Sequence, residues 1–285
     1  MFTSLYCGST ARGSVITIIQ SLPIRNCLLY ICSVELINNT LKSKTYILLP
    51  RNTCFHGSPD LPSYQTFNYR LNLMPEAISE LVRQLIHSFK PQDCDSMKSL
   101  VDSMPIITCA GKNKVGKVAT EITSKGYCST KNMYYFGIKL HAVAFRRKGT
   151  IPFPEMLILS ATDENDSTVF KREYVGNLNN REIYADKIYS DIPFYKETQE
   201  CKKTLAIYSC KSYQRRIPEV TKREKAARDL FSTTVSKVRQ PIEALFNWLN
   251  EKTDIQRAMK VRFTSGLLVH TMEKIAIALI TLIFN

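Results

Sequence analysis

The sequence predicts an α/β fold in which a mixed sheet of five strands is flanked by helices and preceded by a mostly helical N-terminal segment. From residue 98 onward the apolar pattern follows the order βββ-α-β-α-β-α, with an antiparallel hairpin first and alternation afterwards. The chain has 285 residues, 44% hydrophobic and 22% charged, which is enough to bury a proper core. This composition excludes a disordered or fibrous chain.

The first half of this region contains three predicted strands. Lys98–Thr108 is a short apolar run, and because Pro105 interrupts it we expect the strand to end near Asp102. Met133–Phe145 alternates between its two faces, and Glu155–Ser160 follows after a short turn. The second and third strands are therefore predicted to form a hairpin.

Helices and strands alternate in the second half. The predicted elements are a helix that starts at 163–166 and continues through 167–178, a strand over 182–186, a short helix over 193–200, a strand over 205–209 and a helix over 237–251. In the last helix apolar side chains recur every three or four residues, and Pro241 is tolerated if it lies in the first turn.

Two further helices are predicted towards the ends of the chain. Leu71–Phe89 has helical spacing, with Pro75 near its start. Leu267–Phe284 is the most apolar stretch, but Glu273 and Lys274 lie in its middle, where a bilayer would penalise both charges. We therefore expect a buried helix there and no membrane partner.

The pattern divides the chain into three regions: a poorly defined N-terminal segment over 1–57, a helical segment over 58–97, and an α/β domain with its C-terminal helix over 98–285. Residues 1–57 show no sustained period of either kind, and no signal peptide is predicted there. One hypothesis is that an upstream frameshift or a late start codon replaced the native beginning, which would make this segment aberrant.

The positive charge is concentrated in two segments. The chain carries a formal net charge of +14; residues 111–148 hold nine Lys/Arg and one acid, and residues 201–263 hold fifteen Lys/Arg and six acids. A solvated basic surface is the simpler interpretation of one such run, whereas two runs with interleaved tyrosines favour a nucleic acid partner. The nine cysteines contain no C-x-x-C pair, which disfavours zinc ribbons and secreted disulfide scaffolds and suits a reducing cytosol.

Three acids occupy positions that suit a metal site. Asp102 and Asp186 are predicted at strand ends, where open α/β sheets bind ligands, and Glu243 lies on the apolar-periodic helix. Oxygen ligands without Cys or His select Mg²⁺ or Mn²⁺, and two such ions can assist phosphoryl transfer. Each acid also has a simpler interpretation: a turn residue before Pro105, a cap of the next element, and a helix-favouring residue in a first turn.

Several motifs together resemble bacterial insertion-sequence transposases of the DDE superfamily, whose catalytic domain has a ribonuclease H-like fold. The segments that carry the resemblance are LPSYQTFNYRLN at 61–72, VDSMPI at 101–106, YFGIKLHAV at 135–143, ADKIYSD at 185–191, RQPIEALFNWL at 239–249 and the closing helix at 262–280. The resemblance covers roughly residues 58–285 and makes 98–285 the expected catalytic domain.

The resemblance implies a role for particular residues. Matched to the family's motifs, Asp102, Asp186 and Glu243 are the catalytic, metal-holding acids, and Arg239 stands four residues before the glutamate. Ser236 and Asn250 stand where the family often has a tyrosine and a lysine, and Lys252 follows two positions later. The expected DNA contacts are Arg239, Lys187, Lys139 and Lys252.

The implied function is a DNA transposase that holds two Mg²⁺ (or Mn²⁺) ions, cleaves strands at the ends of an insertion sequence and transfers the 3′-hydroxyl to target DNA. Its partners would be double-stranded DNA, both terminal repeats and target, and a second copy of the chain on that DNA. Its location would be the bacterial cytoplasm, at the nucleoid. One alternative is an inactive remnant that still binds DNA, and a less favoured one is a ribonuclease H-like nuclease acting in repair.

Four residues have two competing interpretations. His141 is predicted as a hydrogen-bonded residue on the sheet face in preference to a metal ligand. Tyr134, Tyr135 and Tyr189 could stack on splayed bases, although aromatic residues at strand positions more often belong to the core.

Overall fold

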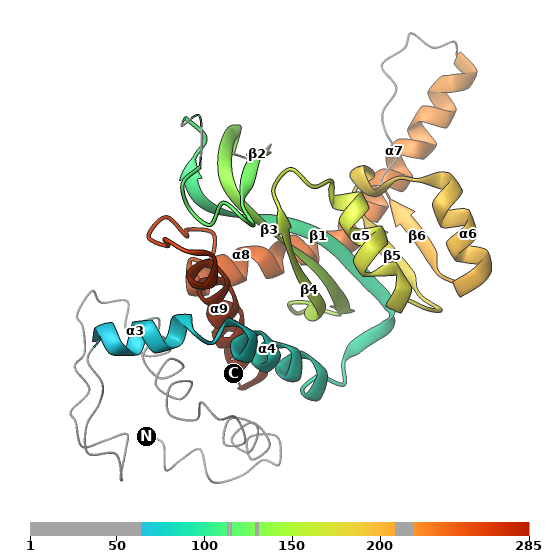
Figure 1. Cartoon of the computed structure of the whole chain (residues 1–285). Coiled ribbons are helices and arrows are strands. Elements are labelled where there is room, and N and C mark those ends of the chain that lie inside the picture. The colour runs from blue at the N-terminus through green and yellow to red at the C-terminus, as the bar shows by residue number, and fades with distance from the viewer. Residues whose placement is uncertain (1–63, 113, 115, 129–130, 209–218, 285) are drawn as a thin grey trace. The chain divides into compact units, whose positions relative to one another are not determined.

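The computed structural model describes residues 64–112, 114, 116–128, 131–208 and 219–284 (Figure 1). These residues form two compact units. The first contains the described residues up to Phe89 together with 251–255 and 261–284, and the second contains 90–250 and 256–260. The C-terminal helix thus belongs with the N-terminal helices, whereas the sequence grouped it with the α/β domain. Residues 1–57, and the hypothesis about them, lie outside the described residues.

The second unit is an α/β domain built on a mixed, open sheet flanked by helices. Its main strands are β1 (Cys94–Ala110), β3 (Met133–Arg147), β4 (Phe153–Ala161), β5 (Glu182–Ala185) and β6 (Leu205–Tyr208). β3 is antiparallel to both β1 and β4, while β5 runs parallel to β1 and β6 parallel to β5. The predicted α/β class and the β3–β4 hairpin are confirmed, and the topology is compatible with a ribonuclease H-like fold.

Across the described residues the sheet has six strands, so the prediction of five was wrong. The additional strand, β2 (Ser124–Cys128), pairs antiparallel with the first residues of β3, from Ser124 opposite Gly137 to Cys128 opposite Met133. β4 pairs with the next part of β3, from Ile138 to Phe145, so the two short strands share one edge. Only Cys128 of β2 is buried, so its sequence shows no clear alternation of apolar and polar residues. For this reason no strand was predicted in this basic stretch.

β1 continues through Asp102 and Pro105, so the prediction that it ends near Asp102 was also wrong. Asp102 lies opposite Ala142, and the ladder with β3 runs on to Ala110. β5 pairs with β1 only across Lys98–Leu100. At Pro105 one edge of β1 therefore has no strand partner, and the missing N–H removes no ladder hydrogen bond there.

One face of the sheet is covered by α5 (Asp166–Glu173) and α6 (Ile192–Lys202). A buried cluster on this face combines alternate strand residues with residues of these helices and of the turns next to them: Val101, Val143, Phe170, Tyr174, Leu178, Ile183, Ala185, Tyr189 and Tyr195. Because successive strand residues point to opposite faces, the neighbours Asp102 and Ala142 belong to the other face. The same alternation places Asp186, which follows Ala185, on that other face.

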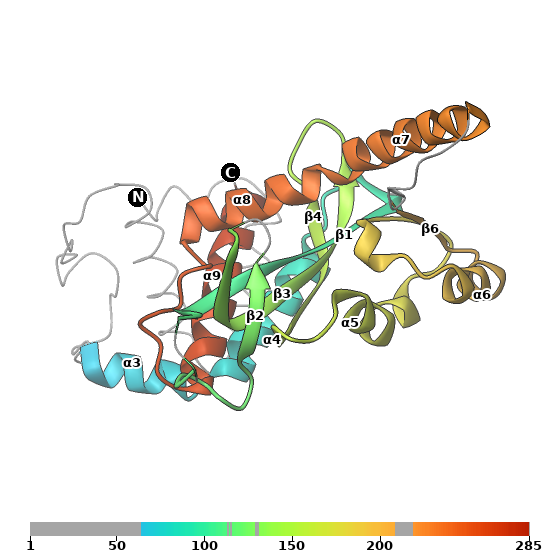
Figure 2. The same ribbon diagram turned by 90° about the horizontal axis from the view of Figure 1, so that it is seen from above.

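Among the described residues, two helices lie between β6 and the C-terminal helix, where the sequence predicted one. α7 (Glu219–Arg239) lies in the polar, basic stretch, and α8 (Pro241–Thr253) begins after Gln240, with Pro241 in its first turn as predicted. The first half of α7 projects away from the sheet (Figures 1 and 2), and its residues 223–231 are exposed. With no buried side of its own, this half carries no apolar periodicity, so the sequence pattern did not reveal it.

The first unit contains α3 (Tyr64–Asn72), α4 (Pro75–Ser88) and α9 (Thr264–Phe284). α4 buries Ile78, Leu81, Val82 and Leu85 and packs against α9. The helix predicted over Leu71–Phe89 is thus confirmed from Pro75 onward, whereas Leu71 and Asn72 belong to the end of α3. Within the described part of the chain, α9 alone is long and apolar enough to cross a membrane by length and composition. Residues 275–279 of α9 are buried, as expected for a core helix.

His141 is buried on the α5 face of the sheet, and its Nε2 lies 2.7 Å from Ser160 Oγ. The prediction of a hydrogen-bonded sheet residue is therefore confirmed. Burial lowers the pKa of His141 from 6.5 to about 4, against the opposing effect of Asp166.

This depressed pKa predicts a loss of stability in acid. Between pH 6.5 and about 4 the unfolded chain binds a proton at His141 that the folded chain does not, so the free energy of unfolding falls as pH falls. The contribution of His141 reaches up to about 3 kcal/mol near pH 4. Urea titrations from pH 7 to 4 should show a shallower acid slope for His141→Gln. The exposed His87, changed to Gln, is the control; equal slopes for wild type and His141→Gln would contradict the prediction.

A candidate acidic site on one face of the sheet

The candidate site centres on the guanidinium of Arg239. Its Nη1 donates to Asp102 Oδ2 at 2.6 Å, and its Nη2 donates to Glu243 Oε1 at 2.5 Å. Arg239 is the last residue of α7 and Glu243 lies in the first turn of α8, so the junction at Gln240 positions both side chains. The sequence separation of 137 residues between Arg239 and Asp102 makes this a tertiary contact of the fold.

Asp186 is the third acid at this site. It follows β5 directly, and its Oδ1 accepts a hydrogen bond from Lys187 N at 2.7 Å, which caps the short 3₁₀ turn Lys187–Tyr189. Burial of Arg239 opposes its charge, but Asp102, Glu243 and Asp186 together raise its pKa above the usual value. All three acids therefore act on one guanidinium.

Asp102 is the most perturbed of these acids. Burial raises its pKa from 3.8 to about 6, and the charges of Glu243 and Asp186 add to the increase. Arg239 and the backbone N–H of Ser103, which donates to Asp102 Oδ1 at 2.8 Å, act in the opposite direction. Asp102 is thus ionised at neutral pH in a place that disfavours its charge.

The donor chemistry of this site fits a hard divalent cation. Asp102, Asp186 and Glu243 supply carboxylate oxygens, the ligand type that such ions prefer, and counted formally against one Arg239 their charge is −2. Among the residues that the structure describes, no group of three or more His, Cys, Asp or Glu side chains is arranged so that it could hold a metal ion. Arg239 supplies the positive charge between the carboxylates here.

The simpler interpretations of the acids are only partly supported. Asp102 is no turn residue, because β1 continues through it. Asp186 does cap the element that follows it, and Glu243 does lie in a helix's first turn. Asp186 and Glu243 therefore have these local roles and also belong to the acidic site. Asp186 can do both because only one of its two carboxylate oxygens caps the turn.

The basic residues predicted to contact DNA occupy different places. Lys187 is exposed beside Asp186, while Arg239 is 13% exposed and bonded to two acids. Lys139 points to the α5 face, where its Nζ donates to Asp166 at 2.7 Å and to the carbonyl of Glu164. Lys252 is exposed and is grouped with the other unit. A DNA contact stays a prediction for all four; Lys139 is engaged in an internal ion pair.

No protein-family model matches the chain, and neither a curated protein nor a solved structure matches it significantly. What distinguishes the site is its geometry and the sequence motifs from which its residues come.

The raised pKa of Asp102 predicts a substitution that stabilises the fold. Because the folded state disfavours the carboxylate relative to the unfolded state, Asp102→Asn should raise the free energy of unfolding at pH 7–8 by about 1–3 kcal/mol. Urea denaturation measures the change.

The matched control is Asp166→Asn, on the opposite face of the sheet. Asp166 accepts from Lys139 and from Ser103 Oγ at 2.8 Å, so the substitution leaves the charge of a largely buried lysine without its carboxylate and should destabilise by about 2–4 kcal/mol. Equal destabilisation by both substitutions would contradict the prediction for Asp102.

Proposed function

We propose that this protein is a DNA transposase of the DDE type, which cleaves strands at insertion-sequence ends in a Mg²⁺- or Mn²⁺-dependent reaction and transfers the 3′-hydroxyl to target DNA. The observation that carries the proposal is the convergence of Asp102, Asp186 and Glu243 on Arg239. These are the four residues that the resemblance matches to catalytic motifs, and they come from a central strand, a strand end and a helix junction.

A ribonuclease H-like fold is part of the proposal. It is supported by the strand order β4-β3-β1-β5-β6, with the first three strands antiparallel and the last two parallel to β1. In this arrangement the first acid lies in the central strand and the second directly after its parallel neighbour. β2 is then an addition at the β3 edge.

The acids have the residue types that metal-assisted phosphoryl transfer needs. Asp102, Asp186 and Glu243 would hold the two ions, which when bound activate a water or a 3′-hydroxyl and stabilise the leaving oxygen. Arg239 forms ion pairs with two of these carboxylates and offsets their charge in part. Its five N–H donors also suit a phosphate, and Lys187 adds an exposed ammonium beside Asp186.

DNA as the partner is supported by where the basic residues lie. Lys112, Lys114, Lys117, Lys125 and Lys131 are all exposed on β2, on the loop before it and on the turn after it. The projecting half of α7 adds Arg223, Lys225 and Arg228, against Glu224 and Asp229. Such surfaces bind the phosphate backbone irrespective of sequence, and binding should weaken steeply with salt. Joining two ends in concert would require a dimer on the DNA, in the bacterial cytoplasm.

The proposal predicts strand cleavage that depends on Asp186. Purified full-length protein is incubated with duplex DNA that carries the flanking element ends, with Mg²⁺ or with a chelator, and products are resolved on denaturing gels. Asp186→Asn should reduce cleavage roughly 100-fold or more, because it removes a charge that the ions require. The exposed Glu197 of α6, changed to Gln, is the control and should cleave at the wild-type rate.

Each other outcome points to a different protein. Salt-sensitive DNA binding without cleavage by the wild type would indicate an inactive remnant. Mg²⁺-dependent cleavage without preference for the element ends would indicate a repair nuclease. Equal cleavage by wild type and Asp186→Asn would overturn the assignment of the site.

A further inference from the structure

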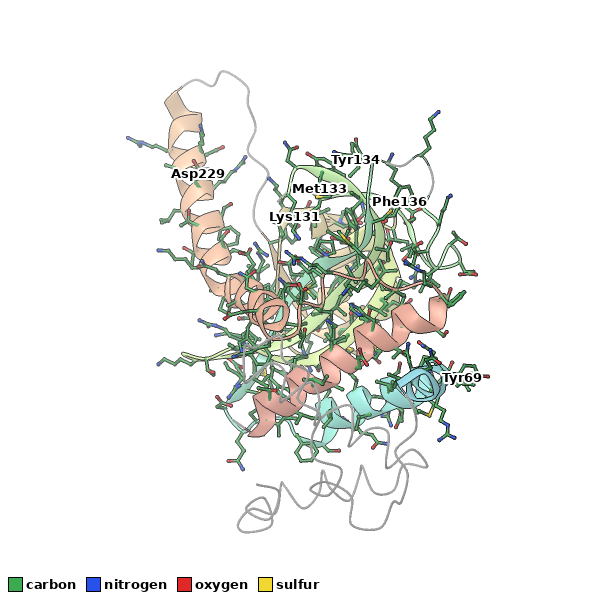
Figure 3. All side chains as sticks on the ribbon, turned by 90° about the vertical axis from the view of Figure 1, so that its left-hand side faces the viewer. Tyr69, Lys131, Met133, Tyr134, Phe136 and Asp229 are labelled. Atoms are coloured by element: carbon green, nitrogen blue, oxygen red, sulfur yellow. The ribbon has the colours of Figure 1, made fainter. Side chains whose placement is uncertain are left out.

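Two tyrosine rings are exposed together at the β2–β3 end of the sheet. Tyr127 and Tyr134 are cross-strand partners, 51% and 59% exposed, and their ring centroids lie 5.1 Å apart at an interplanar angle of 57°. Figure 3 shows Tyr134 at this end of β3, together with Lys131, Met133 and Phe136. Both rings therefore offer aromatic surface to solvent at one place.

The neighbouring backbone fixes where these rings point. Tyr135 is 2% exposed and packs with Ile107 and Cys128 on the opposite face, which turns Tyr134 outward. Gly111 N donates to Tyr134 O at 2.8 Å, and a Cβ at Gly111 would lie 2.4 Å from the Tyr134 carbonyl carbon. The hydroxyl of Tyr127 donates to Asn132 Oδ1 at 2.5 Å. The pair is thus held in position before any ligand arrives.

The surroundings of the pair are positively charged. Lys125 Nζ lies 5.4 Å from the Tyr134 ring centroid and 5.8 Å from that of Phe136, within the range of a cation–π contact. Lys112, Lys114, Lys117 and Lys131 are exposed on the same loop and turn, and residues 111–148 contain a single acid, Glu121. The complementary ligand is therefore a polyanion that carries flat, apolar groups.

The pair shares a sheet face with the acidic site. Tyr134 and Ala142 are eight residues apart on β3, and an even separation keeps them on one face; Asp102 lies directly opposite Ala142. At about 3.3 Å per residue the two places are about 26 Å apart along the strand. Phe136, Ile138 and Leu140, between the two places on this face, are buried, so a nucleic acid strand that reached both would pass outside them and, at 3.4 Å per nucleotide, would need at least about eight nucleotides.

We propose that Tyr127 and Tyr134 form a stacking platform for an unpaired base of a DNA strand. The exposed lysines hold the backbone of that strand, and the base stacks on the Tyr134 ring without sequence preference, because every base has a π face. This inference rests on the proposed function for the identity of the polymer, DNA. Tyr135 and Tyr189, at 2% and 1% exposure, belong to the core and take no part.

Binding of labelled oligonucleotides to the full-length chain tests the platform. Fluorescence anisotropy at one fixed salt concentration compares a single-stranded 20-mer of thymidine with a fully paired 20-base-pair duplex. Tyr134→Ala should weaken single-strand binding about fivefold to 150-fold and change duplex binding less than about twofold. Tyr134→Phe, which keeps the π face, should bind like the wild type.

Two further variants separate stacking from folding. Tyr134→Leu keeps an apolar side chain in the cross-strand pair but removes the ring, so it should lose single-strand binding as the alanine variant does. Tyr69→Ala removes a tyrosine that is 66% exposed on α3 and should leave binding unchanged.

Several results would overturn the inference: a wild type that does not bind the single strand, full binding by Tyr134→Leu, or equal losses for single strand and duplex. Cleavage by the wild type that Asp186→Asn abolishes is scored in a separate assay. The binding assay can therefore contradict the stacking platform while the cleavage assay supports the proposed function. Equally, the cleavage assay can contradict the proposed function while the binding assay supports the platform.

Discussion

The long antiparallel ladder between β1 and β3 determines where almost every other feature of the second unit lies. It extends from Cys94 opposite Arg147 to Ala110 opposite Tyr135. Its register shifts between Asp95 and Ser99 and again between Ile107 and Cys109, and is continuous in between. Because side chains alternate along a strand, the continuous stretch directs Val101 and Val143 into the α5–α6 core and Asp102 to the other face. A slip of β1 by one residue would turn Asp102 towards the aromatic rings of that core and would move Val101 to the face where Leu100 and Ala142 are now buried.

The acidic site works against the stability of the fold that carries it. Like charges gather around Asp102 in a half-buried place, and a single guanidinium offsets them only in part. On the opposite face, by contrast, Lys139, Asp166 and Ser103 satisfy one another. The two clusters on this sheet contain similar residues, but only the one around Asp102 carries an excess of negative charge. Such an uncompensated charge is typical of a site that binds an ion or a charged ligand.

The sequence predicts the fold well where one face of an element is buried. β3, β4, β5 and α4 alternate or repeat clearly, and their predicted positions agree with the structure. β2 and the projecting half of α7 were not predicted, because elements that are exposed on most sides leave no apolar period. The end of β1 was misplaced because Pro105 breaks a strand only where both of its edges are paired.

The candidate site, too, was predicted from the sequence only in part. The acids were found from their residue types and motifs, but the ion pairs around Arg239 were not. The spacing of Arg239 and Glu243 predicts that they lie one helical turn apart. It does not predict the break between α7 and α8 at Gln240, or the ion pair of Arg239 with Asp102, 137 residues away in the sequence. Tertiary contacts of this kind depend on the register of the sheet and on the position of the helices. Neither can be predicted from the local periodicity of the sequence.

The position of Asp102 inside β1 gives the site parts of unequal rigidity. The backbone around Asp102 is paired along the central ladder, and core strands of this kind open at free energies close to that of global unfolding. Asp186 sits on a single 3₁₀ turn and Glu243 at a junction between two helices, and such segments open locally at a smaller free energy. One carboxylate is thus a fixed reference point, towards which two adjustable partners can move while the sheet keeps its shape.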